Sequence, residues 1–117
     1  LGYHIGRKIG FPTINLQPAN ANKLIPAIGV YVCEVKVNDR IYEGVTNIGY
    51  SPTLKTTRIK EIETYILDFD EDLYYKDVEI IFNKRLREEL HFKDKDELIE
   101  AIEVDVNQTR EFFRRRK

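Results

Sequence analysis

The chain has 117 residues, with 19 lysines and arginines against 20 aspartates and glutamates, which gives a formal net charge of −1. This balance argues against a general nucleic-acid or membrane-surface binder, because such a protein needs an excess of basic residues to bind phosphate. Hydrophobic residues make up 42% of the chain, enough for the core of one domain. A single cysteine, Cys33, excludes an internal disulfide, and no apolar run approaches the roughly 20 residues of a membrane-spanning helix. We therefore expect a cytoplasmic protein with one domain over residues 1–117.

The first elements in chain order are loops and a hairpin. Gly2 to Gly29 holds most of the glycines and prolines and little hydrophobic periodicity, which predicts long loops. From Val30 the hydrophobic residues alternate, which predicts a strand with one apolar face made by Tyr31, Cys33, Val35 and Val37. Asn38-Asp39 is typical of a turn, so a returning strand is expected from Ile41 to Ile48. Gly44 within that strand indicates a bend or a close approach.

Two further strands and a helix complete the predicted order. Strands are expected from Ile62 to Phe69 and from Val78 to Leu86, paired with each other as the end of a meander. After Phe92 the period becomes helical, and one apolar face contains Leu98, Ile102, Val106, Thr109 and Phe113. Asp94 is the expected N-cap, with Glu97 placed for a capping-box contact and a helix end near Arg114. Strands followed by one terminal helix predict a small antiparallel barrel or sheet on which the helix packs.

The N-terminal region carries the most specific motif, which runs from Gly6 to Asn15. Its glycines bracket Arg7 and Lys8, and backbone N–H groups in such a segment can face a polyphosphate while a cation neutralises it. Thr13 and Asn15 are two residues apart, so in an extended backbone they offer a hydroxyl and an amide oxygen on one side, donors that suit Mg²⁺. The alternative is an ordinary Gly/Pro turn with an Asn cap.

Glu63 is the second candidate, because it shares a predicted strand face with Tyr65, Leu67 and Phe69. A carboxylate beside a substrate hydroxyl on such a face can accept a proton. The alternative is a strand-end glutamate in a surface ion pair with Lys60 or Arg58. Glu61, expected just outside the strand, is the internal comparison.

Basic residues near the end of the chain give weaker candidates. Arg85 and Arg87 are two apart and are expected to face the same way, which allows a phosphate or flavin-edge contact, while Glu88 and Glu89 offer a local salt-bridge explanation. The basic tail from Arg114 to Lys117 is interpreted as a solvated helix end in preference to a nucleic-acid contact.

Taken in order, these motifs resemble the riboflavin kinase (flavokinase) family, in particular the kinase module of bacterial bifunctional riboflavin kinase/FMN adenylyltransferases. The landmarks cover nearly the whole chain. They are Gly2-x-x-x-Gly6-Arg7-x-x-Gly10-Phe11-Pro12-Thr13-Ile14-Asn15, Gly29-Val30-Tyr31, Gly44 to Thr53, Ile62 to Phe69, Asp72-Leu73-Tyr74, and Leu86-Arg87-Glu88-Glu89 leading to Phe92 and the helix. Ile14 replaces the usual alanine of the Pro-Thr-Ala-Asn motif, and Tyr75 stands where the family often has glycine.

The resemblance implies a roughly six-stranded, Greek-key-like antiparallel barrel with a C-terminal helix, and transfer of the ATP γ-phosphoryl group to the ribityl 5′-hydroxyl of riboflavin to give FMN and ADP. It assigns Glu63 as the catalytic base. It assigns the binding of ATP and its phosphates to Gly2, Gly6, Arg7, Gly10, Thr13 and Asn15. Of these residues, Thr13 and Asn15 are expected to hold Mg²⁺. It places Arg87 near the flavin, and Tyr50 and Phe92 are expected to help bury the flavin ring.

The expected partners are the small molecules riboflavin and ATP, with no nucleic acid and no membrane. Methionine is absent even at position 1, so the chain is expected to be part of a longer protein that lacks here its first strand and any upstream FMN adenylyltransferase domain. The competing hypothesis is a small β-barrel that binds a flavin, a nucleotide or an oligonucleotide without catalysis.

Overall fold

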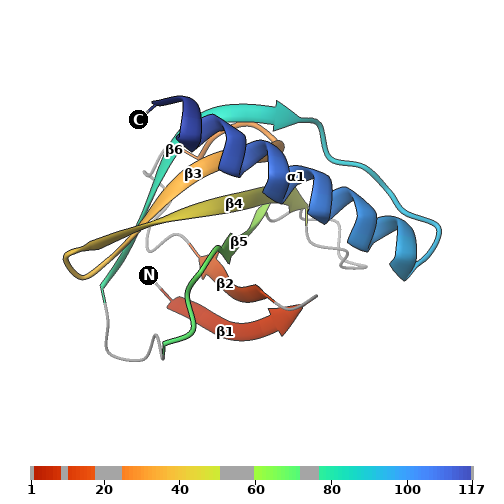
Figure 1. Cartoon of the computed structure of the whole chain (residues 1–117). Coiled ribbons are helices and arrows are strands. Elements are labelled where there is room, and N and C mark those ends of the chain that lie inside the picture. The colour runs from red at the N-terminus through yellow and green to blue at the C-terminus, as the bar shows by residue number, and fades with distance from the viewer. Residues whose placement is uncertain (1, 9–10, 18–24, 51–59, 72–76, 117) are drawn as a thin grey trace.

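The computed structural model describes residues 2–8, 11–17, 25–50, 60–71 and 77–116. In this part of the chain six antiparallel strands form one sheet, and a long helix lies across it (Figure 1). The strands and the helix are β1 (Gly2–Lys8), β2 (Phe11–Gln17), β3 (Gly29–Val37), β4 (Arg40–Tyr50), β5 (Lys60–Ile66), β6 (Val78–Arg87) and α1 (Lys95–Arg116). The predicted mainly β fold with a C-terminal helix is confirmed.

The strand order in the sheet is β1-β2-β5-β4-β3-β6. Strands β3, β4 and β5 follow one another as a meander, and β6 then returns to pair with β3. Four strands in which the last lies beside the first form a Greek key. The expected Greek-key character is therefore present, and the expected pairing of Val78–Leu86 with the preceding strand was wrong.

The N-terminal region differs most from its sequence-based interpretation as loops. Strands β1 and β2 pair along their whole length, from Gly2 opposite Gln17 to Lys8 opposite Phe11. Strand β2 also pairs with β5. Glycine and proline lower the local preference for strand, but tertiary pairing overrides that preference. Pro12 is tolerated because it is the second residue of its strand, close to the strand end.

The sheet is open. Its hydrogen-bonded order starts at β1 and ends at β6, and these two edge strands do not pair with each other in the residues that the structure describes. The expected six-stranded antiparallel barrel or sheet is thus a curved six-stranded sheet that is not closed, and the helix covers part of one face (Figure 1).

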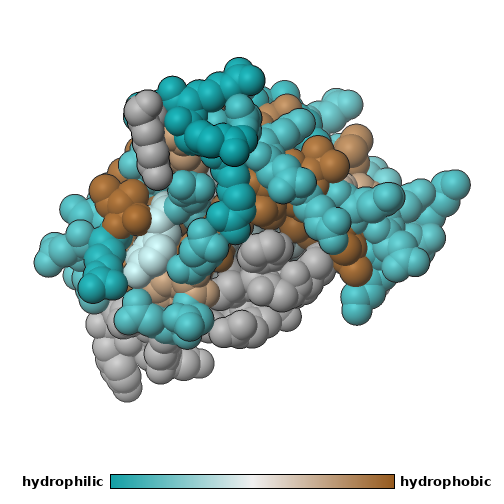
Figure 2. All heavy atoms as spheres, in the orientation of Figure 1, coloured by the Kyte–Doolittle hydropathy of each residue, from teal (hydrophilic) through white to brown (hydrophobic). Residues whose placement is uncertain are grey.

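Two apolar clusters lie on the two faces of the sheet. One cluster, which includes the predicted apolar face of β3, consists of Ile14, Tyr31, Cys33, Val35, Val37, Ile48, Ile62, Ile66 and Phe69. The other joins the sheet to α1 and consists of Val30, Val45, Tyr65, Leu67, Ile102 and Val106. Hydrophilic residues dominate the outward surface of the molecule on the side of α1 (Figure 2). In the described ranges no helix combines the length and the apolar character needed to cross a membrane.

The start of α1 has the predicted N-cap, and Glu97 bonds back to the residue just before it. The Glu97 backbone N–H donates to Asp94 Oδ1 at 3.0 Å, and the Lys93 backbone N–H donates to Glu97 Oε1 at 2.9 Å. These bonds satisfy N–H groups that have no partner within a helix. The predicted inward face is also confirmed. Ile102, Val106, Thr109 and Phe113 are buried, and Leu98 packs against the cluster that contains Ile102 and Val106. Buried Asp105 places a charged group on this face.

The β3–β4 hairpin forms as predicted, with Val37 paired to Arg40 across the turn. Asn38 takes a positive φ of 54°, a conformation that asparagine tolerates well. Gly44 marks a close approach, because a Cβ there would lie 2.6 Å from Val35 Cγ2 and 3.1 Å from Cys33 Sγ. The close approach predicted at Gly44 is thereby confirmed.

A short chain of polar side chains crosses the core at this hairpin. Cys33 Sγ lies 3.0 Å from Thr46 Oγ1, which lies 2.8 Å from Thr64 Oγ1, and all three side chains are fully buried. Each group thus has a partner inside the core, as a buried polar group requires.

Cys33 is expected to resist thiol reagents in the folded protein. Burial raises the pKa of its thiol to about 12, against an ordinary value of 9.0, so the reactive thiolate is scarce at pH 8. Labelling with a chromogenic disulfide reagent should be slow in buffer and rapid in concentrated urea, with one thiol released per chain. Rapid stoichiometric labelling of the folded chain would contradict the burial of this residue.

Candidate active site

The candidate site is built on a row of polar residues across neighbouring strands. Glu63 in β5 is paired in register with Asn15 of β2 on one side and with Asn47 of β4 on the other. Two residues along β5, Tyr65 is paired with Thr13 of β2. Because residues two apart in a strand share a face, the register gathers the predicted base and the predicted metal ligands at one part of the sheet.

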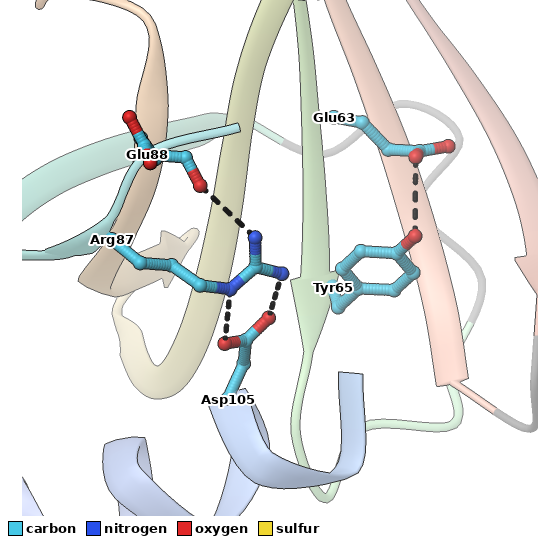
Figure 3. Close-up of polar contacts among 5 residues, drawn as sticks. All are labelled: Glu63, Tyr65, Arg87, Glu88 and Asp105. Carbon is cyan, nitrogen blue, oxygen red and sulfur yellow. Dashed lines mark hydrogen bonds and ion pairs between the residues drawn. The ribbon is translucent and has the colours of Figure 1, made fainter. Parts of the chain in front are cut away.

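Glu63 is half-buried and contacts Tyr65, which lies two residues along on the same face of the strand. The Tyr65 hydroxyl donates to Glu63 Oε1 at 3.2 Å (Figure 3). Burial first, and then the nearby Glu63 carboxylate, raise the pKa of Tyr65, so its hydroxyl keeps the proton that it donates. The predicted shared face of Glu63 and Tyr65 is confirmed, and Leu67 belongs to the same cluster as Tyr65. The prediction was wrong for Phe69, because β5 ends at Ile66, Asp68 takes a positive φ of 56°, and Phe69 packs in the cluster on the opposite face. The contact with Tyr65 orients one carboxylate oxygen of Glu63. Because β5 begins at Lys60, Glu61 lies inside the strand rather than outside it.

A cavity of about 210 Å³ lies beside this row, between α1 and the sheet. Its polar lining comes from three elements and includes Asn47, Arg87 and Asp105, while Phe92 and Ile102 contribute apolar surface. Tyr65 also lines the cavity, and its hydrogen bond to Glu63 connects that carboxylate to the cavity. A concave, mostly apolar site with a few convergent polar groups is the usual form of a small-molecule site.

Arg87, at the end of β6, is held by the helix. Its Nε donates to Asp105 Oδ1 at 2.9 Å and its Nη2 donates to Asp105 Oδ2 at 2.7 Å, while Nη1 donates to the Glu88 carbonyl at 3.1 Å (Figure 3). The local salt-bridge partners considered from sequence, the Glu88 and Glu89 carboxylates, are thus replaced by a carboxylate from α1.

Arg85 does not share the position of Arg87, although the two were expected to face the same way. A register shift between Val30 and Tyr31 pairs Arg87 with Val30 and Arg85 with Tyr31, whose side chains belong to opposite faces of β3. A bulge of this kind re-aims the side chains that follow it. Arg85 instead donates to the Ile28 carbonyl at 3.1 Å.

The structure brings some of the predicted residues together and leaves others apart. Arg87 and Phe92 line one cavity, and Glu63 is joined to it through Tyr65. Gly2, Gly6 and Arg7 lie in β1, where Gly6 is paired with Thr13. Gly10 falls outside the described residues, as do the side chains of Arg7, Asn15 and Tyr50, although the last residue ends β4.

Three residues of the site were missed from sequence alone. Asn47 is identified by its pairing with Glu63, Tyr65 by its hydroxyl, and Asp105 by its bidentate contact with Arg87. For Asp105 a signal existed, because an aspartate on the apolar face of a helix needs a buried partner.

The basic tail behaves as a solvated helix end in its described part. Arg114 and Arg115 form ion pairs with Glu111, and Arg116 pairs with Glu34. Each of these arginines is exposed. This arrangement gives no support to an oligonucleotide-binding role for the tail.

Comparison with known proteins identifies the family. The family model described as "Flavokinase: Riboflavin kinase" matches residues 1–113. The chain is 42% identical to a bifunctional riboflavin kinase/FMN adenylyltransferase of Listeria monocytogenes over 92% of its length, and 37% identical to one of Escherichia coli over 96%. It spans about a third of the length of these relatives, 34% and 35% respectively.

A solved structure shares the architecture. It is described as a macrolide-efflux protein from Streptococcus pneumoniae, is 30% identical, and superposes with a TM-score of 0.77 over 87% of this chain and 33% of that one. What it adds is the shared fold. The match over residues 1–113, together with these relatives, shows that the chain belongs to the riboflavin kinase family.

Proposed function

We propose that this chain transfers the γ-phosphoryl group of ATP to the 5′-hydroxyl of riboflavin, giving FMN and ADP. Besides family membership, one observation carries the proposal. The strand register aligns Asn15, Glu63 and Asn47 beside a cavity between the sheet and α1. A proton acceptor and oxygen donors next to a partly apolar cavity suit a substrate with a flat ring and a hydroxylated side chain.

Glu63 is the proposed base. As the 5′-oxygen attacks the γ-phosphorus in line, the O–P bond to ADP breaks and the hydroxyl proton passes to the Glu63 carboxylate. Positioning carries most of this chemistry, because the protein forms no covalent bond to the phosphoryl group. The hydrogen bond from Tyr65 restricts the orientation of the carboxylate.

Thr13 and Asn15 are the proposed ligands of Mg²⁺. Their hydroxyl and amide oxygens are hard donors, and Thr13 is almost fully buried opposite Tyr65. Among the residues described here, no three histidine, cysteine or acidic side chains gather at one point. Two neutral oxygen donors suit a cation whose remaining ligands are phosphate oxygens and water. When bound, the ion offsets the negative charge of the transferring phosphate.

The remaining residues are assigned either to ATP or to the flavin. Gly2, Gly6, Arg7 and Gly10 are proposed to face the ATP phosphates, and Arg87, Phe92 and Tyr50 are proposed to bind the flavin. We further propose that the chain works in the cytoplasm, joined to an FMN adenylyltransferase domain like its longer relatives.

The test is incubation of the folded chain with riboflavin, ATP and Mg²⁺, with FMN followed by chromatography. Formation of FMN and an equal amount of ADP is the expected result. A folded chain that binds riboflavin and ATP but forms no FMN would instead establish a binding module without catalysis.

A further inference from the structure

We propose that Asp105 is a positioning residue for substrate recognition. It holds the Arg87 guanidinium so that two parallel N–H groups are presented to a ligand with two neighbouring hydrogen-bond acceptors. The identification of that ligand as the riboflavin ring rests on the proposed function.

The contact between the two side chains fixes the guanidinium in both position and plane. Asp105 accepts from Nε at 2.9 Å and from Nη2 at 2.7 Å, which is a bidentate pair. Such a pair adds geometric specificity to its charge interaction, since both N–H groups must align with both oxygens. The third bond, from Nη1 to the Glu88 carbonyl, holds the opposite side.

These bonds leave a defined edge of the guanidinium for a ligand. Arginine has five N–H groups, and the contacts within the described ranges use three of them. One N–H remains on Nη1 and one on Nη2, at the end of the side chain. Figure 3 shows Asp105 on one side of the guanidinium and the Glu88 carbonyl on the other. Arg87 lines the cavity, and these two N–H groups are the ones that its contacts leave for a bound molecule.

The burial of Asp105 favours positioning over stability as the reason for the pair. Its side chain is 3% exposed, against 24% for Arg87, and its helix neighbours Ile102 and Val106 are apolar and buried. An apolar residue on that face would avoid the cost of desolvating a carboxylate, and replacing a buried ion pair by apolar residues is often neutral or stabilising. A carboxylate there is useful when the arginine must be held in one orientation.

The lining of the cavity selects among ligands. Phe92 and Ile102 offer apolar surface beside the arginine, which suits a flat, mostly apolar ring more than a phosphate. The pyrimidine side of the flavin ring has such acceptor pairs, a ring nitrogen next to a carbonyl oxygen. The fork on Arg87 therefore fits the ring of riboflavin better than the phosphates of ATP.

The test replaces Asp105 by asparagine and measures the KM values for riboflavin and ATP separately. We expect Asp105→Asn to raise the KM for riboflavin about tenfold or more, as expected when a charge-assisted hydrogen bond is lost. The KM for ATP and kcat should stay within about twofold. Flavin fluorescence quenching gives the affinity for riboflavin without turnover. An increase confined to the KM for ATP would overturn the proposal, as would no change in either constant.

A second variant keeps the proposal falsifiable if Asp105→Asn fails to fold. Arg87→Lys retains an ion pair with Asp105 but offers no planar fork, so it should show the same selective rise in the KM for riboflavin. Wild-type affinity for riboflavin in folded Arg87→Lys would overturn the proposal.

A matched control lies on the same helix. Arg110 forms a bidentate pair with Asp68, at 2.8 and 3.2 Å, on the exposed side of the molecule. Asp68→Asn breaks this pair, and asparagine tolerates the positive φ of 56° at this position. Both KM values should stay at wild type, and a rise in the KM for riboflavin here would overturn the assignment to Asp105. Absence of FMN from the wild-type chain, in contrast, would count against the proposed function alone.

Discussion

Glu63→Gln is expected to lower kcat for FMN formation by about 10²–10⁴-fold, the usual contribution of a general base. Glutamine preserves the size of the side chain and an oxygen for the Tyr65 hydroxyl, which donates to Glu63 at 3.2 Å. It removes the negative charge and the ability to accept the proton of the ribityl hydroxyl. ATP binding, measured by calorimetry with Mg²⁺ present, should be largely unchanged. The variant should also unfold at close to the wild-type temperature, since Glu63 is half-buried at the edge of the core.

Glu61→Gln is the control, because it makes the same change two residues earlier on the same strand face. Glu61 is exposed and paired with Gly49, so it lies away from Asn15 and Asn47. Its kcat should stay within about twofold of wild type, as is usual for a surface substitution. Equal losses in the two variants would show that negative charge along β5 matters in general, and would remove Glu63 from the role of base.

The parts of the fold that could be predicted from sequence are those set by local patterns. The β3–β4 hairpin follows from strict alternation and an Asn-Asp turn, and α1 follows from a 3.6-residue period with Asp94 and Glu97 at its start. The shared face of Glu63 and Tyr65 is also a local property, since it depends only on an extended backbone.

The parts that could not be predicted depend on contacts between distant segments. In the part of the chain that the structure describes, strand β6 pairs with β3 and not with the preceding strand β5. The local sequence of β6 does not indicate which of these strands it pairs with. Strands β1 and β2 form despite several glycines and a proline because they pair with each other and with β5. The bulge beside Val30 separates Arg85 from Arg87, and the contact of Asp105 with Arg87 then follows from where α1 packs.

Thr13→Val is expected to raise the Mg²⁺ concentration needed for half-maximal activity by about tenfold or more. Losing a residue that only supports a metal ligand already lowers metal affinity by about tenfold or more, and losing a ligand should lower it at least as much. Valine has nearly the shape of threonine and lacks the hydroxyl oxygen proposed as a ligand. Thr13 is 3% exposed, so the substitution retains the buried volume. The measurement is the FMN formation rate against Mg²⁺ at fixed riboflavin and ATP.

Thr64→Val is the matched control for Thr13→Val, because the two threonines are both buried on adjacent strands and point to opposite faces of the sheet. Thr13 is paired with Tyr65, whereas Thr64 is paired with Ile14 and its Oγ1 lies 2.8 Å from Thr46 Oγ1 in the core. Removing the Thr64 hydroxyl should lower the free energy of unfolding by about 1 kcal/mol, the value of one buried hydrogen bond, and leave the Mg²⁺ dependence unchanged. If Thr13→Val folds and keeps the wild-type Mg²⁺ dependence, the oxygen of Thr13 is not a ligand.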